Sequence, residues 1–361
     1  MCLVWSVTYL ARCTYPSFVK VSKFESIQAM RALAAIMVLV LHSKIMFCAE
    51  ERASLLVIPG FSDIGYYGVQ LFFVISGFII AHVVSKPGFN VMPFFVRRAL
   101  RIYPLWWIVM SVGLAMYFWR SWFRADVELL GWVGVLKSYA LLPQKPYPFI
   151  NPGWSLEYEV IFYAIVALLY PLTGIWGVFV LMLGLSTAAN AFKPANGYHL
   201  VDGSYLFFGA GIVAYLLRNR SWREAAPLAA GGLALAYARF YEAIPIGINE
   251  AMMALATGFA SLLVVVVSLE RSGWSVPRFI IRIGDASYSL YLWHWLLIPL
   301  LSMVRNVLFA DTGSPELWRW IFIFTSIAVA QASFRWLELP SIALGDRLSR
   351  RIAGIRVREL G

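Results

Sequence analysis

Charged residues are scarce in this chain: they make up 14% of its 361 residues, whereas 61% are hydrophobic. A soluble domain usually has about 25% charged residues. Because the shortage runs along the whole length, it argues against a soluble enzyme with one membrane anchor. Stretches of roughly 20 apolar residues, enough to cross a bilayer as a helix, recur between short charged segments. Strict alternation of polar and apolar residues is not evident, which argues against an outer-membrane barrel.

Cysteine is also rare. The chain has three, Cys2, Cys13 and Cys48, and their spacing fits neither a disulfide framework nor a zinc site, so we expect no metal. Residues 1–22 have no basic residue before their apolar part and no clear cleavage site. We therefore interpret them as an N-terminal extension without an assigned role, not as a cleaved signal peptide.

The apolar pattern predicts an all-α polytopic membrane protein. Its ten predicted spans lie at about 27–47, 64–85, 102–119, 154–171, 174–191, 202–217, 226–241, 250–269, 286–309 and 318–337. The stretch 131–142 is too short to span comfortably and is expected to be interfacial or re-entrant. Pro340 is expected to end the last helix. The spans form a membrane domain over 23–340, and a basic tail follows over 341–361.

The net charge of +11 fits membrane topology better than nucleic-acid binding. With the N-terminus inside, about two thirds of the Lys and Arg residues fall in cytoplasmic segments, as the positive-inside rule requires. Both termini are then cytoplasmic. No soluble catalytic domain is evident at either end, so chemistry must use residues within or at the edge of the helical bundle.

The first span places Arg31 and His42 on one helix face, because eleven residues make three turns plus about 20°. The two side chains are then roughly 16 Å apart along the axis. Ionisable groups at such depth normally face a polar cavity. A histidine there can take a proton from a sugar hydroxyl or attack an acyl carbonyl. The alternative is a buried histidine bonded to a neighbouring helix.

An arginine cluster follows the second span. Arg98 and Arg101 are three residues apart and share a helix face, with Arg97 beside them. Guanidinium groups bind phosphates through paired hydrogen bonds, which suits the three phosphate groups of coenzyme A. The alternative is a role in topology and lipid-headgroup contact.

Polar residues also occur in the second and fourth spans. Ser76 and Gly77 are small residues that allow close helix packing, and Ser76 could instead face a cavity. Glu157 and Glu159 open the fourth span and point about 200° apart, so at most one faces a cavity directly. That carboxylate could orient an acceptor sugar or polarise a histidine. The alternative is stabilisation of the helix N-terminus.

The ninth span has Ser287, Tyr291 and His294 on one face, which makes a polar cavity more credible. Aromatic residues, with Tyr288 and Trp154 among them, suit stacking on sugars. The alternative is interhelical hydrogen bonding.

Three more ionisable residues lie near helix ends. Glu338 is expected to lie at the cytoplasmic edge, where it could pair with a loop arginine. His82 and His199 are interpreted as ordinary.

The chain resembles the membrane-bound acyltransferase-3 family from about Phe24 to Pro340. The resemblance rests on an ordered set of segments, IQAMRALAAIMVLVLH, YYGVQLFFVISGF, FFVRRALRIYP, NPGWSLEYE, IGDASYSLYLWHW and ELP. It is nearest to exopolysaccharide-type acetyltransferases without an appended esterase-like domain.

The resemblance implies a bacterial inner-membrane enzyme. It would move an acyl group, with acetyl expected, from cytoplasmic acyl-CoA to a hydroxyl of an exopolysaccharide, an O-antigen or a lipid-linked sugar. The resemblance implies that His42 is catalytic and forms the family's pair with Arg31, and that Arg98 and Arg101 contact acyl-CoA. The family often has Asp at the position of Gln70, so a carboxylate role falls to Glu157, Glu159 or Glu338. The candidate site residues are then His42, Arg31 and Glu157 for catalysis, Arg97, Arg98 and Arg101 for acetyl-CoA, and Ser76, Trp154, Glu159, Tyr288, Tyr291 and His294 for the acceptor.

Two hypotheses from other classes remain open at this point. One is a transporter for polysaccharide precursors, although inverted repeats and broken helices in matched halves are not clear in the sequence. The other is a non-catalytic subunit of a polymer secretion complex.

Overall fold

The computed structural model describes residues 24–58, 64–145, 147–192, 199, 201–309 and 314–354. Helices are the only regular secondary structure within these ranges. The N-terminal extension, Cys2, Cys13 and residues 355–361 of the tail lie outside the described residues.

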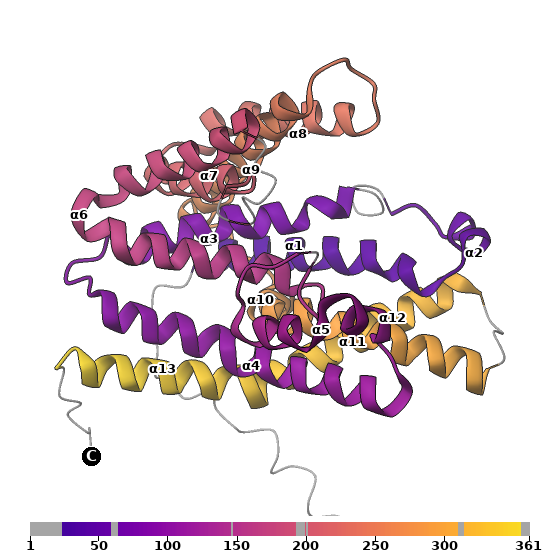
Figure 1. The fold of residues 1–361 in the computed structure, drawn as a ribbon. Helices are drawn as coiled ribbons and strands as arrows, with labels where there is room; N and C mark the ends of the chain where they lie inside the picture. Colours follow the sequence, from indigo (N-terminus) through magenta and orange to yellow (C-terminus); the bar gives the residue numbers. More distant parts are fainter. Residues whose placement is uncertain are drawn as a thin grey trace, which may run out of the picture.

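The elements follow one another as a series of helices joined mostly by short connections (Figure 1). The first half contains α1 (Glu25–Ser43), η1 (Lys44–Met46), α2 (Ala49–Ser54), η2 (Ile64–Tyr67), α3 (Gly68–Val84), α4 (Val91–Arg120), α5 (Arg124–Ala140) and α6 (Gly153–Phe192). The second half contains α7 (Tyr205–Leu216), α8 (Trp222–Phe240), α9 (Ile248–Arg271), α10 (Arg278–Asp285), α11 (Ser287–Leu308), α12 (Pro315–Ser333), η4 (Phe334–Glu338) and α13 (Leu339–Ile352).

Seven helical segments among the described residues are long and apolar enough to cross a membrane. They contain α1, α3, α4, α6, α9, α11 and the continuous α12–η4–α13 segment. This confirms the all-α, multi-pass fold. The predicted count of ten and the cytoplasmic placement of both termini stay predictions.

The seven segments differ from the ten predicted spans in three places. The predicted spans 154–171 and 174–191 are two arms of α6, which meet at Gly174, where φ is 65° (Figure 1). A positive φ is the conformation that glycine adopts most readily, so Gly174 allows the helix to change direction. The span predicted at 202–217 corresponds to α7, a shorter apolar helix. The span predicted at 226–241 corresponds to α8, which is not among the seven.

Small residues bring α3 and α7 into close contact, as expected for Ser76–Gly77. A Cβ atom on Gly77 would lie 2.1 Å from the carbonyl oxygen of Phe208, and one on Gly211 would lie 2.0 Å from that of Val74. Both distances are far below van der Waals contact, so the two backbones approach this closely only because neither position has a side chain. Ser76 and Gly77 therefore have different roles, since Gly77 serves packing and the Ser76 hydroxyl forms a hydrogen bond described below.

The short stretch predicted at 131–142 lies largely within α5, whose backbone breaks at Gly131 (φ 62°, ψ 170°). The helix is fixed to α4 by two tryptophans. Trp106 Nε1 donates to the carbonyl of Ser138 at 2.8 Å, and Trp107 Nε1 donates to that of Tyr139 at 3.0 Å. The opposite face exposes Leu129, Trp132, Val133 and Leu136. An interfacial position for α5 stays a prediction.

Pro340 does not end the last helix, which corrects the sequence-based prediction. The chain passes from α12 through a π-helical turn, Phe334–Glu338, into α13, and Pro340 lies in the first turn of that helix. Proline is tolerated inside this continuous helical segment because the π-helical turn before it adjusts the backbone hydrogen bonds that proline would otherwise break. The first part of the predicted tail is thus helical. It runs alongside α4 (Figure 1), and Ser349 Oγ donates to the carbonyl of Pro93 at 2.9 Å.

Candidate functional site

Two histidines that are far apart in the sequence meet inside the bundle. His42 lies in the last turn of α1, and its Nδ1 is 2.8 Å from Nε2 of His294 in α11. The two rings are nearly parallel, at 3°, and Trp295 presents an edge to His42 with ring centroids 5.4 Å apart. His294 is buried and His42 is half-buried. We call His42 and His294 the histidine pair. His42 therefore faces a protein partner rather than lipid alone.

Tyr291 connects the histidine pair to the start of α6. It lies one turn before His294, with ring centroids 5.9 Å apart. Its hydroxyl is 2.8 Å from Ser155 Oγ and donates to the carbonyl of Pro152 at 3.2 Å. The predicted common face of Tyr291 and His294 is thus present. The phenol is held by α6, so its hydroxyl is already hydrogen-bonded in the structure.

The predicted arginines gather towards the other end of α1. The charges of Arg101, Glu338, Glu159 and Asp285 all act on Arg31, and those of Arg101 and Glu159 act on Arg98. The guanidinium of Arg98 lies over two rings, 5.7 Å from the centroid of Phe94 and 5.5 Å from that of Tyr163. We call Arg31, Arg98, Arg101, Glu159 and Glu338 the arginine–glutamate cluster. It combines three guanidinium groups and two carboxylates from α1, α4, α6 and η4.

Glu159 connects this cluster to α3. It accepts hydrogen bonds from Ser76 Oγ at 3.0 Å and from the hydroxyl of Tyr163. The sequence pattern did not single out Tyr163, although its spacing of four residues from Glu159 places both on one helix face. Ser76 and Glu159, two predicted acceptor-site residues, are therefore in direct contact.

Glu338 and Tyr288 lie at the α11 side of the cluster. Glu338 is 1% exposed and accepts a hydrogen bond from Ser289 Oγ at 2.9 Å. The basic charges that act on it belong to Arg101 and Arg31. Both arginines lie on helices, so neither is the loop arginine that was expected to pair with Glu338. Tyr288 donates to the carbonyl of Ile102 at 2.8 Å, which connects α11 to α4.

Glu157 and Glu159 point to different partners, as their spacing predicts. Glu157 is 0% exposed, and its Oε2 lies 2.6 Å from Nδ1 of His199. Glu157 therefore contacts His199 and not the histidine pair, and a role in polarising His42 finds no contact to support it. The interpretation of His199 as ordinary missed this pairing, because no sequence spacing connects residues 42 positions apart.

Arg97 and Trp154 occupy the margins of the described site. Arg97 is exposed on α4 beside the cluster. Trp154 packs edge-on against Phe73 and Tyr158, with ring centroids 6.3 and 5.9 Å apart. Neither forms a described contact with the histidine pair. A separate cavity of about 420 Å³ lies between α6, α7, α8 and α9, and no predicted site residue lines it.

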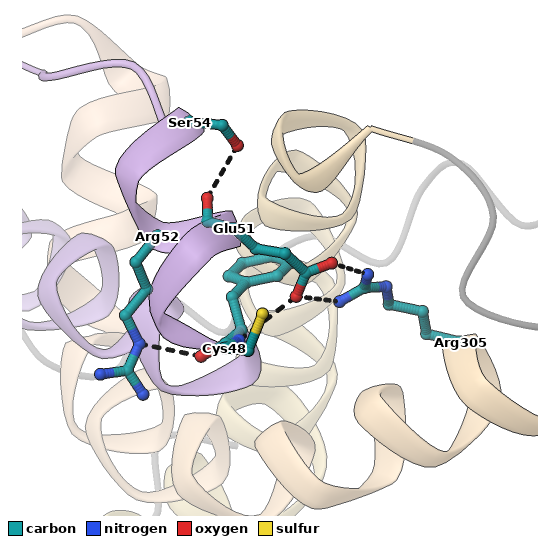
Figure 2. A network of polar contacts seen from close by, with 6 residues as sticks. Cys48, Glu51, Arg52, Ser54 and Arg305 are labelled. Atoms are coloured by element: carbon teal, nitrogen blue, oxygen red, sulfur yellow. Dashed lines mark hydrogen bonds and ion pairs between the residues drawn. The ribbon is translucent and has the colours of Figure 1, made fainter.

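The connection after α1 is fixed to the end of the bundle where His42 lies. Figure 2 shows Arg305 of α11 binding the carboxylate of Glu51 in α2 through both terminal nitrogens. Glu51 also accepts the backbone N–H of Cys48 at 3.2 Å, and Arg52 donates to the carbonyl of Phe47 at 2.8 Å. The side chain of Arg305 is only 4% exposed. Because this connection begins at Lys44, two residues after His42, its anchoring helps to hold the end of α1 in place.

The hydrogen bonds from Arg305 lower the pKa of Glu51 below its ordinary value of 4.5. The contact between Arg305 and Glu51 therefore stabilises the folded protein fully above pH 4.5. This stabilisation is lost as the pH falls through the lower pKa that Glu51 has in the folded state. Glu51→Gln should lower the free energy of unfolding by about 1–2 kcal/mol at neutral pH. In acid the difference should shrink, because the native carboxyl is then protonated. Thermal unfolding of purified protein across pH would measure both effects.

Glu50→Gln is the matched control, because Glu50 is exposed and has no described arginine partner. It should lower the stability much less than Glu51→Gln near neutral pH. Equal stability of Glu51→Gln and native protein at neutral pH would contradict a stabilising role for the Arg305 contact.

Comparison with known proteins decides the family. The sequence model of one family, described as an acyltransferase domain, matches residues 24–334. The chain belongs to the acyltransferase-3 family. It is 30% identical to the exopolysaccharide production protein ExoZ of Rhizobium meliloti over 315 residues, which cover 82% of this chain and 95% of that protein.

Two further relatives span most of the chain. Nodulation protein 10 of Rhizobium leguminosarum is 26% identical over 79% of this chain and 84% of its own length. Acyltransferase MdmB of Streptomyces mycarofaciens is 24% identical over 77% of this chain and 80% of its own length. No solved structure matches the chain significantly. As a multi-pass member of the acyltransferase-3 family, the chain is an enzyme, so the transporter and non-catalytic subunit hypotheses are set aside.

Proposed function

We propose that this acyltransferase-3 protein resides in the bacterial inner membrane and moves an acetyl group from cytoplasmic acetyl-CoA to a sugar hydroxyl. The acceptor is an exopolysaccharide, an O-antigen or their lipid-linked precursor. The main support is the position of His42, which shares α1 with Arg31 and contacts a second histidine inside the bundle. Imidazole is the side chain best suited to proton transfer near neutral pH.

The donor site is assigned to the arginine–glutamate cluster. Arg98 and Arg101, with the exposed Arg97 beside them, bind the phosphates of coenzyme A. The pantetheine arm then extends along α1 towards His42, a rise of roughly 16 Å from Arg31. Glu159 and Glu338 partly offset the three guanidinium charges when no donor is bound, which lowers the cost of holding several cations in the bundle.

Two routes of acyl transfer fit an imidazole at His42. In the first, a ring nitrogen takes the proton of the acceptor hydroxyl, the oxygen attacks the thioester carbonyl, and the C–S bond breaks. The proton then passes to the leaving thiolate. In the second, the ring nitrogen attacks the carbonyl itself and coenzyme A leaves. The acceptor oxygen then displaces the imidazole, and its proton neutralises the thiolate.

The acceptor is proposed from the names of the relatives and from polar and aromatic side chains of the helical bundle. ExoZ is named for exopolysaccharide production. Hydroxyl, carboxylate and aromatic side chains are the groups that recognise sugars. Tyr291 lies beside the histidine pair, and the other candidates, Ser76, Trp154, Glu159 and Tyr288, lie elsewhere in the bundle.

The direct test is NMR of surface polysaccharide from cells with and without this gene. Deletion should remove an O-acetyl signal, and the intact gene should restore it. Purified protein should also transfer labelled acetyl from acetyl-CoA to deacetylated polymer. Identical polymer from both strains, together with no transfer from acetyl-CoA in vitro, would reject this donor and acceptor.

A further inference from the structure

The contacts of the histidine pair assign a proton to each ring. His294 Nδ1 lies 3.2 Å from the carbonyl oxygen of Leu290. A carbonyl oxygen only accepts hydrogen bonds, so His294 Nδ1 must hold a hydrogen. In a neutral imidazole one nitrogen is a donor and the other is an acceptor. The Nε2 of neutral His294 therefore presents a lone pair.

That lone pair is directed at His42. The two nitrogens, His42 Nδ1 and His294 Nε2, are 2.8 Å apart, a normal hydrogen-bond distance. Because His294 Nε2 is the acceptor, His42 Nδ1 must be the donor. The lone pair of neutral His42 then lies on Nε2. This nitrogen forms no hydrogen bond with the described part of the chain, and the His42 ring is half-buried rather than sealed.

We propose that His294 is a positioning residue, which keeps His42 in the tautomer whose Nε2 is free to react. The proposal deepens the proposed function and rests on it for the reaction. His294 does not touch the transferred group in either route. It acts through His42, by fixing both the ring orientation and the nitrogen that is unprotonated.

The same hydrogen bond stabilises the charge that develops on His42. When Nε2 takes the hydroxyl proton, or forms a bond to the acyl carbon, the ring becomes positive and Nδ1–H becomes a stronger donor. His294 Nε2 accepts that stronger hydrogen bond. Proton and charge remain balanced, because His294 keeps its own Nδ1–H on the carbonyl of Leu290 throughout.

A histidine is better suited than a carboxylate for this position. A buried carboxylate without a paired cation has a large desolvation cost in an apolar bundle. Neutral His294 orients its neighbour without that cost. The described rings nearest the pair, Tyr291 and Trp295, are also uncharged. The orienting group is therefore a neutral acceptor held by backbone, in a region of low polarity.

The tautomer can be measured without substrate. The chain has four histidines, so ¹⁵N-histidine NMR of full-length protein in detergent can be assigned by single substitutions. His42 should show a protonated Nδ1 and an unprotonated Nε2 at a pH where both rings of the pair are neutral. In His294→Leu this preference should disappear. A native His42 with its proton on Nε2 would overturn the proposal, even if acetyl transfer itself is established.

Kinetics separate positioning from a structural role. His294→Leu should lower kcat by about 100-fold, the scale of a misdirected general base, with the KM for acetyl-CoA unchanged. His294→Gln should recover at least tenfold over the leucine variant, because its amide oxygen can accept from His42 Nδ1. Equal losses in both variants, or a loss that follows only thermal stability, would reject the positioning role. The two proposals can fail separately. If the polymer NMR test fails while His42 shows the expected tautomer, the acetyl donor or the acceptor is wrong, but the proposed orientation of His42 is not.

Discussion

Replacing His42 by alanine should reduce acetyl transfer by at least about 10³-fold, while the protein still inserts and folds. Both proposed routes need a nitrogen lone pair at this position, and loss of a positioned acid–base group alone costs on the order of 10²–10⁴ in rate. The change removes a half-buried ring beside Trp295 and His294, so some loss of stability is expected as well. Initial rates with labelled acetyl-CoA and deacetylated polymer would measure the effect, with membrane insertion followed by immunoblotting.

His82→Ala is the matched control for this experiment. His82 is also a helix histidine, and its ring packs against Phe24 and Tyr215 rather than in the histidine pair. Its substitution should leave the rate near the native value. A His42→Ala protein that acetylates polymer at the native rate would show that the chemistry lies elsewhere. Trapping labelled acetyl on His42 without acceptor would favour the covalent route over direct transfer.

Contacts within one helix could be predicted from the sequence, because α-helical geometry is regular. The divergence of Glu157 and Glu159 followed from their two-residue spacing, and the common face of Tyr291 and His294 followed from their three-residue spacing. Both are present, since Glu159 contacts Ser76 whereas Glu157 contacts His199, and the rings of Tyr291 and His294 lie 5.9 Å apart. These predictions needed only the rotation of 100° per residue.

Contacts between helices could not be predicted in the same way. His42 and His294 are 252 positions apart, and no periodicity in one chain indicates that α1 and α11 lie side by side at that depth. Both residues were singled out from the sequence, but a catalytic role was predicted for His42 and acceptor binding for His294. Pro340 shows a different failure, because a local rule for ending helices was applied where the helix instead continues into α13. The outcome depended on a π-helical turn, which the sequence pattern does not indicate.

Replacing Arg98 and Arg101 together by alanine should weaken acetyl-CoA binding by about 100-fold. Hydrogen bonds between charged partners contribute about 1.5–3 kcal/mol each, and the double change removes two guanidinium groups from the proposed phosphate site. The loss should therefore appear mainly in the KM for acetyl-CoA, with a smaller change in kcat at saturating donor. The difference in KM between the native and the variant protein should also shrink as the salt concentration rises, because salt screens the contacts between arginine and phosphate in the native protein.

A serious objection is that the double change leaves Glu159 and Glu338 with fewer cations and destabilises the bundle. Arg98→Lys with Arg101→Lys addresses this, since it keeps both charges and removes only the paired geometry of guanidinium on phosphate. It should bind donor better than the alanine protein and worse than the native one. Arg120→Ala, at the opposite end of α4, controls for loss of a cation from the same helix and should leave the KM unchanged. If the alanine double variant keeps the native KM while His42→Ala is inactive, the arginines serve topology rather than donor binding, and acetyl-CoA reaches His42 by another path.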